Sequence, residues 1–205
     1  MLIKICGIRL QEDVDCLIKA GIDFCGFIFH KESPRFLSVQ EAAQLETGSM
    51  DRVGVFVNEG LEEILSAVEV ARLRYVQLHG DYSEEVAREI GEERVIRVLW
   101  PERFAYTAQL YREMLRHSHC AYYLLDAGFS RGGSGRRFNW HEVGGMDIPR
   151  PWFLAGGLNE NNFTQAMLIA RPDGLDFNSG IESAIGKKKH EAIMKISERA
   201  RRKSV

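Results

Sequence analysis

The chain has 205 residues, 45% of them hydrophobic, which is enough to bury a sizeable core in one domain. A net charge of −2 argues against non-specific nucleic-acid binding, and no apolar run is long enough to cross a bilayer. There is no signal-peptide pattern, and neither a C-x-x-C nor a metal-like spacing with histidine occurs among Cys6, Cys16, Cys25 and Cys120. We therefore expect a cytoplasmic protein with no metal site, no nucleic-acid partner and no membrane partner.

Strand-like and helix-like segments alternate along the chain, which favours a parallel sheet covered by helices. The predicted strands are 2–6, 24–29, 52–57, 75–79, 94–99, 121–126, 152–155 and 174–177. The predicted helices are 10–20, 39–47, 60–72, 83–90, 103–117, 159–170 and 188–203, with a doubtful helix between the sixth and seventh strands. These elements predict an α/β fold, a (β/α)8 TIM barrel that forms a single domain over 1–205. The alternative, an open doubly wound sheet, lacks its expected G-x-G-x-x-G after the first strand.

The first strand alternates in character. Ile3 and Ile5 share one face, which we expect to meet the helices, whereas Lys4 and Cys6 share the inward face. Cys6 then lies at the carboxyl end of a barrel strand, where enzymes of this fold carry their chemistry. A nearby cation such as Lys4 favours the thiolate. A buried cysteine that acts only as a small hydrophobic residue is the alternative.

Three further strands end at polar residues. Arg35 follows the second strand and offers a planar fork suited to a carboxylate, although an isolated loop arginine is more often surface charge. His79 ends the fourth strand and is either a substrate contact or a structural histidine. Asp126 ends the sixth strand, a natural place for a general acid or base, with a turn aspartate as the alternative. The glycine-rich, cationic segment 127–137 after it is either a mobile cover or a solvated connection.

The last two strands predict a phosphate site. The strand 152–155 stops at Gly156 and Gly157, and Asn159 offers an oxygen that can cap the next helix. The strand 174–177 runs into Asn178, Ser179 and Gly180. One Gly-Gly pair alone indicates only a helix-entry turn. Two such ends in this order predict the phosphate cup that (β/α)8 barrels build after strands seven and eight.

Strand alternation also places charges inside the predicted barrel. Lys4, Gln77, Arg97 and Asp176 fall on inward faces. Two unpaired cations in a packed interior are strongly unfavourable, so we expect Asp176 to pair with Lys4. A register error of one residue in any strand would turn its charge outward.

Taken together, these residues resemble the phosphoribosylanthranilate isomerase family of tryptophan biosynthesis. No single fragment is specific, but the ordered set covers nearly the whole chain: Lys4-Ile5-Cys6-Gly7, Ser33-Pro34-Arg35, Val55-Phe56-Val57-Asn58, Gln77-Leu78-His79-Gly80, Leu125-Asp126 with Gly132-Gly133-Ser134-Gly135 and Phe138-Asn139-Trp140, Leu154-Ala155-Gly156-Gly157-Leu158, and Asp176 with Ser179-Gly180-Ile181-Glu182. The resemblance implies a (β/α)8 fold, no cofactor, a phosphosugar-anthranilate substrate and an Amadori rearrangement, the third step from chorismate to tryptophan. We leave open whether the protein is a monomer or a homodimer.

The resemblance also implies residue roles. Cys6 is then the general base and Asp126 the general acid. The predicted substrate-binding residues are Arg35 near the anthranilate group, and His79, Gly156, Gly157, Asp176, Asn178, Ser179 and Gly180. For this chemistry the pKa of the carboxyl, usually about 4, and that of the thiol, about 8.5, must each shift toward neutrality, or only a minor form of the group reacts.

The chain departs from the family pattern near its end. Asn178-Ser179 replaces a serine pair, and residues 184–189 lack the usual Pro-Gly and Lys-Asp, with Ile185 and Lys189 in their place. We expect this change to loosen the last helix without touching a catalytic group.

Two other functional hypotheses stay open: another phosphosugar barrel, such as indole-glycerol-phosphate synthase or thiamine-phosphate synthase, and a non-catalytic phosphate-ligand sensor. Neither calls for a Cys/Asp pair at strands one and six.

Overall fold

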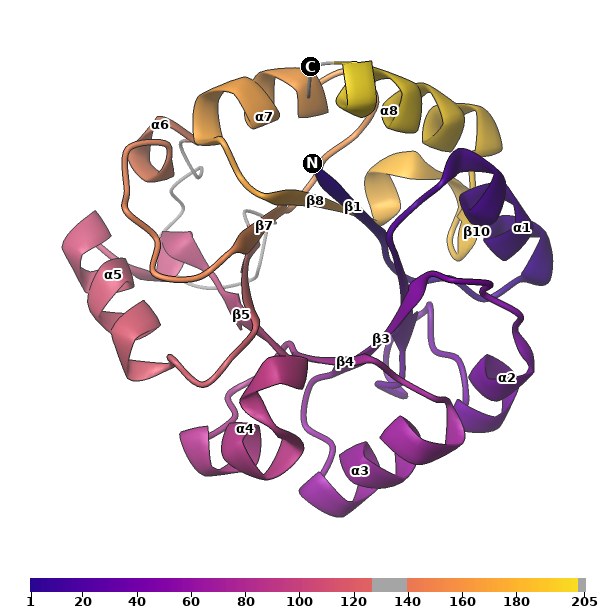
Figure 1. Cartoon of the computed structure of the whole chain (residues 1–205), viewed down its shortest axis with the longest axis horizontal. Helices are drawn as coiled ribbons and strands as arrows, with labels where there is room; N and C mark the ends of the chain where they lie inside the picture. The colour runs from indigo at the N-terminus through magenta and orange to yellow at the C-terminus, as the bar shows by residue number, and fades with distance from the viewer. Residues whose placement is uncertain (127–139, 203–205) are drawn as a thin grey trace.

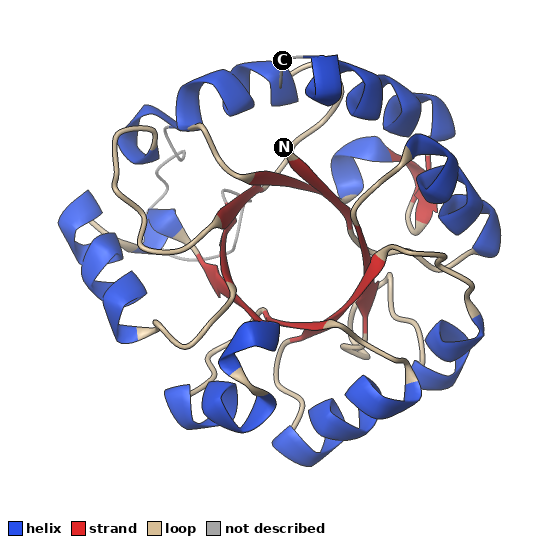
Figure 2. Cartoon of the chain, in the orientation of Figure 1, coloured by secondary structure: helices blue, strands red, loops and turns tan. Residues whose placement is uncertain are grey.

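A computed structural model describes residues 1–126 and 140–202. Figures 1 and 2 show a ring of strands seen along the barrel axis, with helices around the outside. Each strand pairs in parallel with the next, and the last pairs with the first, so the barrel is closed. Its strands are β1 (Leu2–Ile5), β2 (Phe24–Ile28), β3 (Asp51–Phe56), β4 (Tyr75–Leu78), β5 (Val95–Leu99), β6 (Tyr122–Asp126), β7 (Trp152–Ala155) and β8 (Gly174–Phe177). The predicted (β/α)8 barrel is confirmed, with every strand boundary within one residue.

The helices of the described chain are α1 (Gln11–Ala20), α2 (Val39–Gln44), α3 (Leu61–Val70), α4 (Glu84–Ile90), α5 (Thr107–Arg116), α6 (Trp140–Val143), α7 (Phe163–Ala170) and α8 (His190–Arg202). α5 begins four residues later than predicted because Pro101–Arg103 forms a separate 3-10 turn. A β-hairpin that was not predicted, β9 (Glu182–Ala184) with β10 (Lys187–Lys188), precedes α8. Among these helices none is long and apolar enough to cross a membrane.

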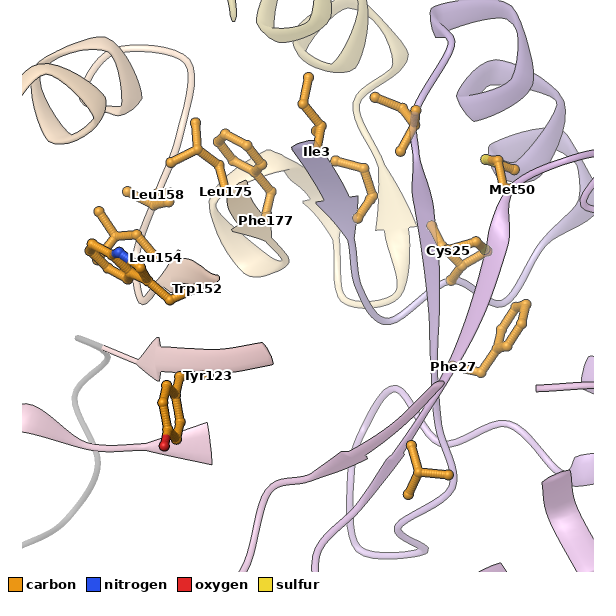
Figure 3. Close-up of a cluster of buried hydrophobic side chains, with 14 of the residues drawn as sticks. Ile3, Cys25, Phe27, Met50, Tyr123, Trp152, Leu154, Leu158, Leu175 and Phe177 are labelled. Carbon is orange, nitrogen blue, oxygen red and sulfur yellow. The ribbon is translucent and has the colours of Figure 1, made fainter. Parts of the chain in front are cut away.

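The large hydrophobic core lies between the barrel and the helices. Ile3 and Ile5 are fully buried in it, as their alternation predicts. Figure 3 shows part of this cluster, with Cys25, Phe27 and Leu154 among the labelled side chains. Every second strand residue therefore packs against a helix, which leaves the remaining residues to fill the barrel interior.

A second core closes the amino end of the barrel. The rings of Phe24, Tyr75, Tyr122 and Phe153 meet with centroids 5.3 to 6.1 Å apart, and each stands at or next to the start of its strand. Gly174 makes room for this layer, because a Cβ there would lie 2.3 Å from the Phe153 ring. The aromatic layer fills one end of the barrel, so a ligand can enter only from the carboxyl ends of the strands.

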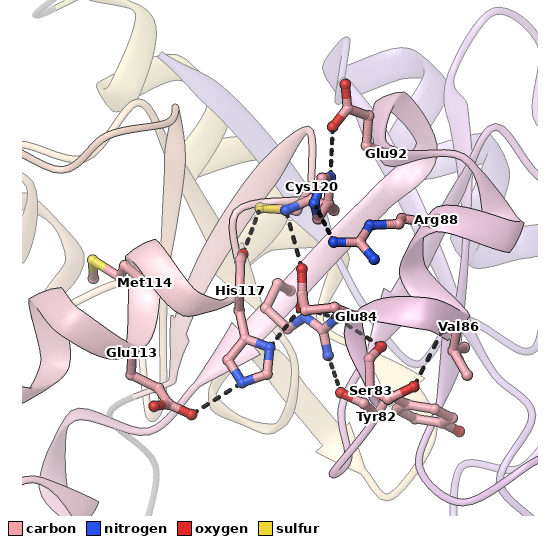
Figure 4. A network of polar contacts seen from close by, with 12 residues as sticks. Tyr82, Ser83, Glu84, Val86, Arg88, Glu92, Glu113, Met114, His117 and Cys120 are labelled. Carbon is pink, nitrogen blue, oxygen red and sulfur yellow. Dashed lines mark hydrogen bonds and ion pairs between the residues drawn. The ribbon is translucent and has the colours of Figure 1, made fainter.

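Arg97 corrects one predicted register. Its neighbours Ile96 and Val98 belong to the interior core, so Arg97 faces the helices instead of the barrel axis. Its guanidinium donates to Glu84 Oε1 at 2.9 Å and to the Tyr82 carbonyl at 2.7 Å. Figure 4 shows the network around Glu84, which ties α4 to β5 and to the end of α5. The prediction that Arg97 lies inside the barrel is wrong.

Candidate active site

A cavity of about 390 Å³ opens at the carboxyl ends of the strands. Its lining includes all ten predicted site residues, drawn from six strand ends and the loops after them: Cys6, Arg35, His79, Asp126, Gly156, Gly157, Asp176, Asn178, Ser179 and Gly180. The fold therefore brings together residues that lie up to 174 positions apart in the sequence. The glycine-rich segment 127–137 lies outside the described residues.

Beneath Cys6 lies a buried ion pair. Lys4 is completely buried, and its Nζ lies 2.9 Å from Asp176 Oδ2. The two residues are register partners on β1 and β8, which places their side chains on the same inward face. The predicted pairing of Lys4 with Asp176 is confirmed. Burial opposes the charge on Lys4, but Asp176 and the Cys6 thiol outweigh it and raise the pKa of Lys4.

The Cys6 thiol is 4% exposed and faces both the cavity and this pair. Burial raises its pKa above the usual value, while Lys4 and, more weakly, Lys188 lower it and Asp176 raises it further. Lys4 thus acts in the predicted direction, but the net shift of the Cys6 pKa is away from neutrality, which leaves the expected alternative that only a minor form of the thiol reacts. The loss of hydration on burial disfavours the charged thiolate more strongly than the nearby Lys4 ammonium favours it.

Two buried oxygens at the floor of the cavity have no hydrogen-bond partner among residues 1–126 and 140–202. They are Asp176 Oδ1 and Gln77 Oε1. Both residues line the cavity. Buried polar atoms are normally paired, so two open acceptors at one place suit a ligand that carries hydroxyl groups.

Asp126 ends β6 and shares the cavity with His79, whose Nε2 lies 3.9 Å from Asp126 Oδ2. On its other side, His79 Nδ1 lies 3.3 Å from Gln77 Nε2, and the ring stands edge-on to Trp100 at 5.3 Å. Burial and the charge of Lys4 lower the pKa of His79 to about 4. His79 is therefore a neutral ring at pH 7, able to donate or accept a hydrogen bond without adding charge beside the acid.

The turn after β7 has the backbone geometry predicted for an anion site. Gly156 and Gly157 adopt φ values of 93° and 64°, which side chains disfavour. The turn is held by Asn162, which donates to the Gly157 carbonyl at 3.0 Å and accepts from the Asn159 N–H at 2.8 Å. Asn159 does not cap the helix as predicted: α7 begins at Phe163 with Asn162 at its N-cap, because the asparagines first form this turn.

The segment after β8 completes the cup. Residues Ser179–Ile181 form a 3-10 turn directly after Asn178. A Cβ on Gly180 would lie 2.1 Å from the Leu158 carbonyl oxygen, so a glycine is required where the two loops touch. The turn at Gly156 and Gly157 and the turn at Ser179–Ile181 therefore belong to loops that pack against each other, and together they form one concave surface.

Arg35 reaches the cavity with one edge of its fork already paired. Its Nε and Nη2 donate to Glu182 at 2.8 and 2.6 Å. Lys188 also reaches the site and donates to Asn178 Oδ1 at 3.0 Å. Its charge also lowers the pKa of the Cys6 thiol. The expectation that the changes at Ile185 and Lys189 touch no catalytic group stays a prediction.

The comparisons with known proteins agree with this geometry. The family model for N-(5'phosphoribosyl)anthranilate (PRA) isomerase matches residues 3–199. An N-(5'-phosphoribosyl)anthranilate isomerase from Desulfovibrio desulfuricans is 50% identical, over 94% of this chain and 92% of that protein. This chain belongs to the PRA isomerase family.

Solved structures of PRA isomerases match along almost the whole chain. The crystal structure of the enzyme from Thermotoga maritima is 34% identical with a TM-score of 0.86, and the match covers 98% of each chain. Another crystal structure of a PRA isomerase, in complex with reduced 1-(o-carboxyphenylamino)-1-deoxyribulose 5-phosphate, is 32% identical with a TM-score of 0.83, and the match covers 98% of each chain.

Sequence reasoning did not assign Glu182 and Lys188 to the site. Glu182 stood within a fragment typical of PRA isomerases but was given no role. Lys188 lies in a run of three lysines, a pattern that usually indicates a solvated surface. Three identical residues give no alternation, so the sequence offered no signal that Lys188 is buried. In the described part of the chain, no group of three or more His, Cys, Asp or Glu side chains is arranged to hold a metal ion.

Proposed function

We infer that this chain converts N-(5-phosphoribosyl)anthranilate to 1-(2-carboxyphenylamino)-1-deoxyribulose 5-phosphate, an Amadori rearrangement in the biosynthesis of tryptophan. Family membership supports the reaction, and the decisive observation is one cavity that holds Cys6 and Asp126 together with a phosphate cup. The product-like ligand named for a related structure carries the same phosphate and aromatic carboxylate groups.

Asp126 is the proposed general acid. Its protonated carboxyl gives a proton to the ribose ring oxygen, the C1–O bond breaks, and the nitrogen lone pair forms an iminium cation. The neutral ring of His79, 3.9 Å away, leaves Asp126 without a cationic histidine beside it. A cation there would favour the carboxylate and reduce the population of the acid.

Cys6 is the proposed general base. Its thiolate removes the C2 proton of the iminium, and the C–H electrons neutralise the nitrogen. The resulting enolamine gains a proton at C1 and loses the proton of its C2 hydroxyl, which gives the ketone. Burial keeps the thiol protonated in the free enzyme, because it raises the pKa of Cys6. The iminium places a positive charge beside the sulfur at the step that needs the thiolate, and that charge lowers the pKa.

The remaining site residues are proposed to bind the substrate. Gly156, Gly157, Ser179 and Gly180 are suited to the phosphate, and Asn178 lies beside them. Arg35 is placed near the anthranilate group. The open oxygen of Asp176 is an acceptor for a ribose hydroxyl, and His79 is the ring next to the reacting sugar.

We also propose that residues 1–205 form one domain and that the protein acts in the cytoplasm. It acts as a monomer or a homodimer; one related structure describes monomers generated from a dimeric enzyme of Thermotoga maritima, at 32% identity.

The direct test is loss of substrate fluorescence when purified protein is added to N-(5-phosphoribosyl)anthranilate. Turnover that disappears in Cys6→Ser and in Asp126→Asn, both still folded, is the expected result. A wild-type protein that binds the substrate without converting it would overturn the proposal and favour a phosphate-ligand sensor.

A further inference from the structure

The most unusual charge outside the proposed catalytic pair is Lys188. Its side chain is completely buried, although it belongs to a hairpin at the surface of the barrel. The ammonium donates to Asn178 Oδ1 at 3.0 Å, to the Asn178 carbonyl at 3.4 Å and to Glu182 Oε1 at 2.8 Å. An ammonium has three donors, so these bonds use all of them.

Glu182 carries the connection onward to Arg35. It accepts both donors of the Arg35 fork, and its side chain is only 5% exposed. Burial raises the pKa of Glu182, but Arg35 and Lys188 together outweigh burial and hold it below the usual value. Glu182 is therefore a carboxylate at neutral pH and binds two cations at once.

The two ends of this chain of contacts meet beside the reacting centre. A Cβ on Gly7 would lie 2.8 Å from Asn178 Oδ1 and 2.9 Å from Arg35 Cδ. Gly7 directly follows Cys6, and Arg35 and Asn178 both line the cavity. Asn178 adjoins the phosphate cup, whereas Arg35 is the residue proposed to bind the aromatic carboxylate.

The hairpin itself is anchored, which fixes the position of Lys188. Fully buried Asp13 on α1 accepts from the Lys188 N–H at 3.4 Å and pairs with His190 at 2.8 Å. The Lys189 N–H donates to the Ile181 carbonyl at 2.8 Å. A buried cation with fixed backbone and fixed partners sets distances between those partners; an exposed lysine does not.

We propose that Lys188 is a positioning residue that sets the spacing between the two anion-binding ends of the site. It holds Asn178 at the phosphate end directly and Arg35 at the carboxylate end through Glu182. The ligand class it selects is one that carries a phosphate and an aromatic carboxylate on a single molecule. The inference rests on the proposed function for the identity of that molecule.

The test compares three ligands by calorimetry. They are the reduced product analogue, its counterpart without the aromatic carboxylate, and its counterpart without the phosphate. In Lys188→Met, the affinity for the full analogue should fall about tenfold or more, because its phosphate and its carboxylate must both be bound at the same time. Each single-anion ligand should lose about threefold or less, since one end can adjust to it alone.

Glu182→Gln separates the two ends. It breaks the link to Arg35 but leaves the bonds from Lys188 to Asn178, so only ligands with the carboxylate should weaken. Lys187→Met is the matched control: Lys187 is the preceding hairpin residue, is 58% exposed and pairs with Glu12 at 3.6 Å. It should bind all three ligands as the wild type does.

Equal losses on all three ligands in Lys188→Met would overturn the proposal, because general loss of charge or of local structure predicts that pattern. A loss confined to phosphate-bearing ligands would also overturn it. If the single variant does not fold, Lys188→Met/Glu182→Gln removes both charges and gives the same comparison. Absence of wild-type turnover would refute the proposed function alone, since these affinities are measured without catalysis.

Discussion

Two buried charge networks lie on opposite sides of the barrel wall. Inside, Lys4 pairs with Asp176 below Cys6, and Asp176 Oδ1 has no partner in the described chain. Outside, Glu84 uses both oxygens: Oε1 meets Arg97 and His117, and Oε2 accepts from the His119 N–H at 3.3 Å. One carboxylate keeps an open acceptor in a cavity, and the other keeps none (Figure 4).

The open oxygen of Asp176 distinguishes a charge that can bind a ligand from a charge, such as Glu84, that only holds parts of the fold together. A fully paired carboxylate between helices and strands holds elements together and has nothing left for a ligand. A carboxylate with one bonded and one open oxygen is held in place and still able to accept a hydroxyl. Changes inside the barrel should therefore alter turnover as well as stability, whereas changes outside should alter stability alone.

The largest effect is expected on turnover. Cys6→Ser and Asp126→Asn should each lower kcat by ~10²–10⁴-fold, the usual contribution of a positioned base or acid. Thermal unfolding should stay close to that of the wild type, because both side chains face the cavity. Near-normal kcat in either folded variant would remove that residue from the mechanism.

Breaking the inner pair should affect both properties. Lys4→Met leaves Asp176 buried without its counter-ion and should cost about 3–5 kcal/mol in denaturant unfolding. Asp176→Asn leaves the Lys4 ammonium buried without its counter-ion and should lower the free energy of unfolding by a similar amount. The double variant should cost less than the sum of the two, whereas strict additivity would show that the charges do not interact.

The same Lys4→Met variant tests whether the Lys4 ammonium lowers the pKa of the Cys6 thiol. Lys4 lowers the pKa of the Cys6 thiol, so its loss should slow alkylation of Cys6 by iodoacetamide at pH 8. Site-resolved mass spectrometry distinguishes Cys6 from the other cysteines. An unchanged alkylation rate would show that the ammonium does not act on the sulfur.

Breaking the outer network should cost stability and leave catalysis intact. Glu84→Gln should destabilise by about 2 kcal/mol, less than Lys4→Met, because Glu84 is 19% exposed. The kcat should stay within about twofold of the wild type, since none of its partners lines the cavity. Glu92→Gln, whose carboxylate is 56% exposed beside His119, is the control and should cost less than about 1 kcal/mol.

The last expected effect is a dependence of stability on pH. The folded protein holds the pKa of His79 at about 4, below its unfolded value, so the unfolded chain binds the extra proton first. The contribution of His79 is complete above pH about 6.5 and is lost as the pH falls toward 4. Between pH 7 and 4.5 the wild type should lose about 1–3 kcal/mol more stability than His79→Gln, allowing for the partly exposed ring. Parallel stability profiles would contradict a depressed pKa.

Local rules predicted most of the fold and the place of the site. Alternation identified the inward face of β1, and the end of each strand identified cavity residues such as Cys6, Asp126 and Gly157, because parallel barrel strands expose their carboxyl ends together. The pair of Lys4 and Asp176 followed from charge alone, since a buried cation requires a counter-ion.

What failed depended on contacts between distant segments. Arg97 was placed inward because a five-residue strand buried on both faces gives no alternation to fix its register. Lys188 looked solvated because only the folded hairpin brings Asn178 and Glu182 around it. Asn159 was assigned as a cap, but the carbonyl of Gly157 and the neighbouring asparagines offered competing partners.

Barrel closure by β1 and β8 has a consequence for synthesis of the protein on the ribosome. Lys4 and Asp176 are 172 residues apart, so at ~5–20 residues per second Lys4 is synthesised about 9 to 34 s before its counter-ion. Until then the first strand presents an uncompensated ammonium on the face that must become the interior, which disfavours premature burial. The charge that later supports Cys6 thus also delays closure of the barrel until the last strand can join it.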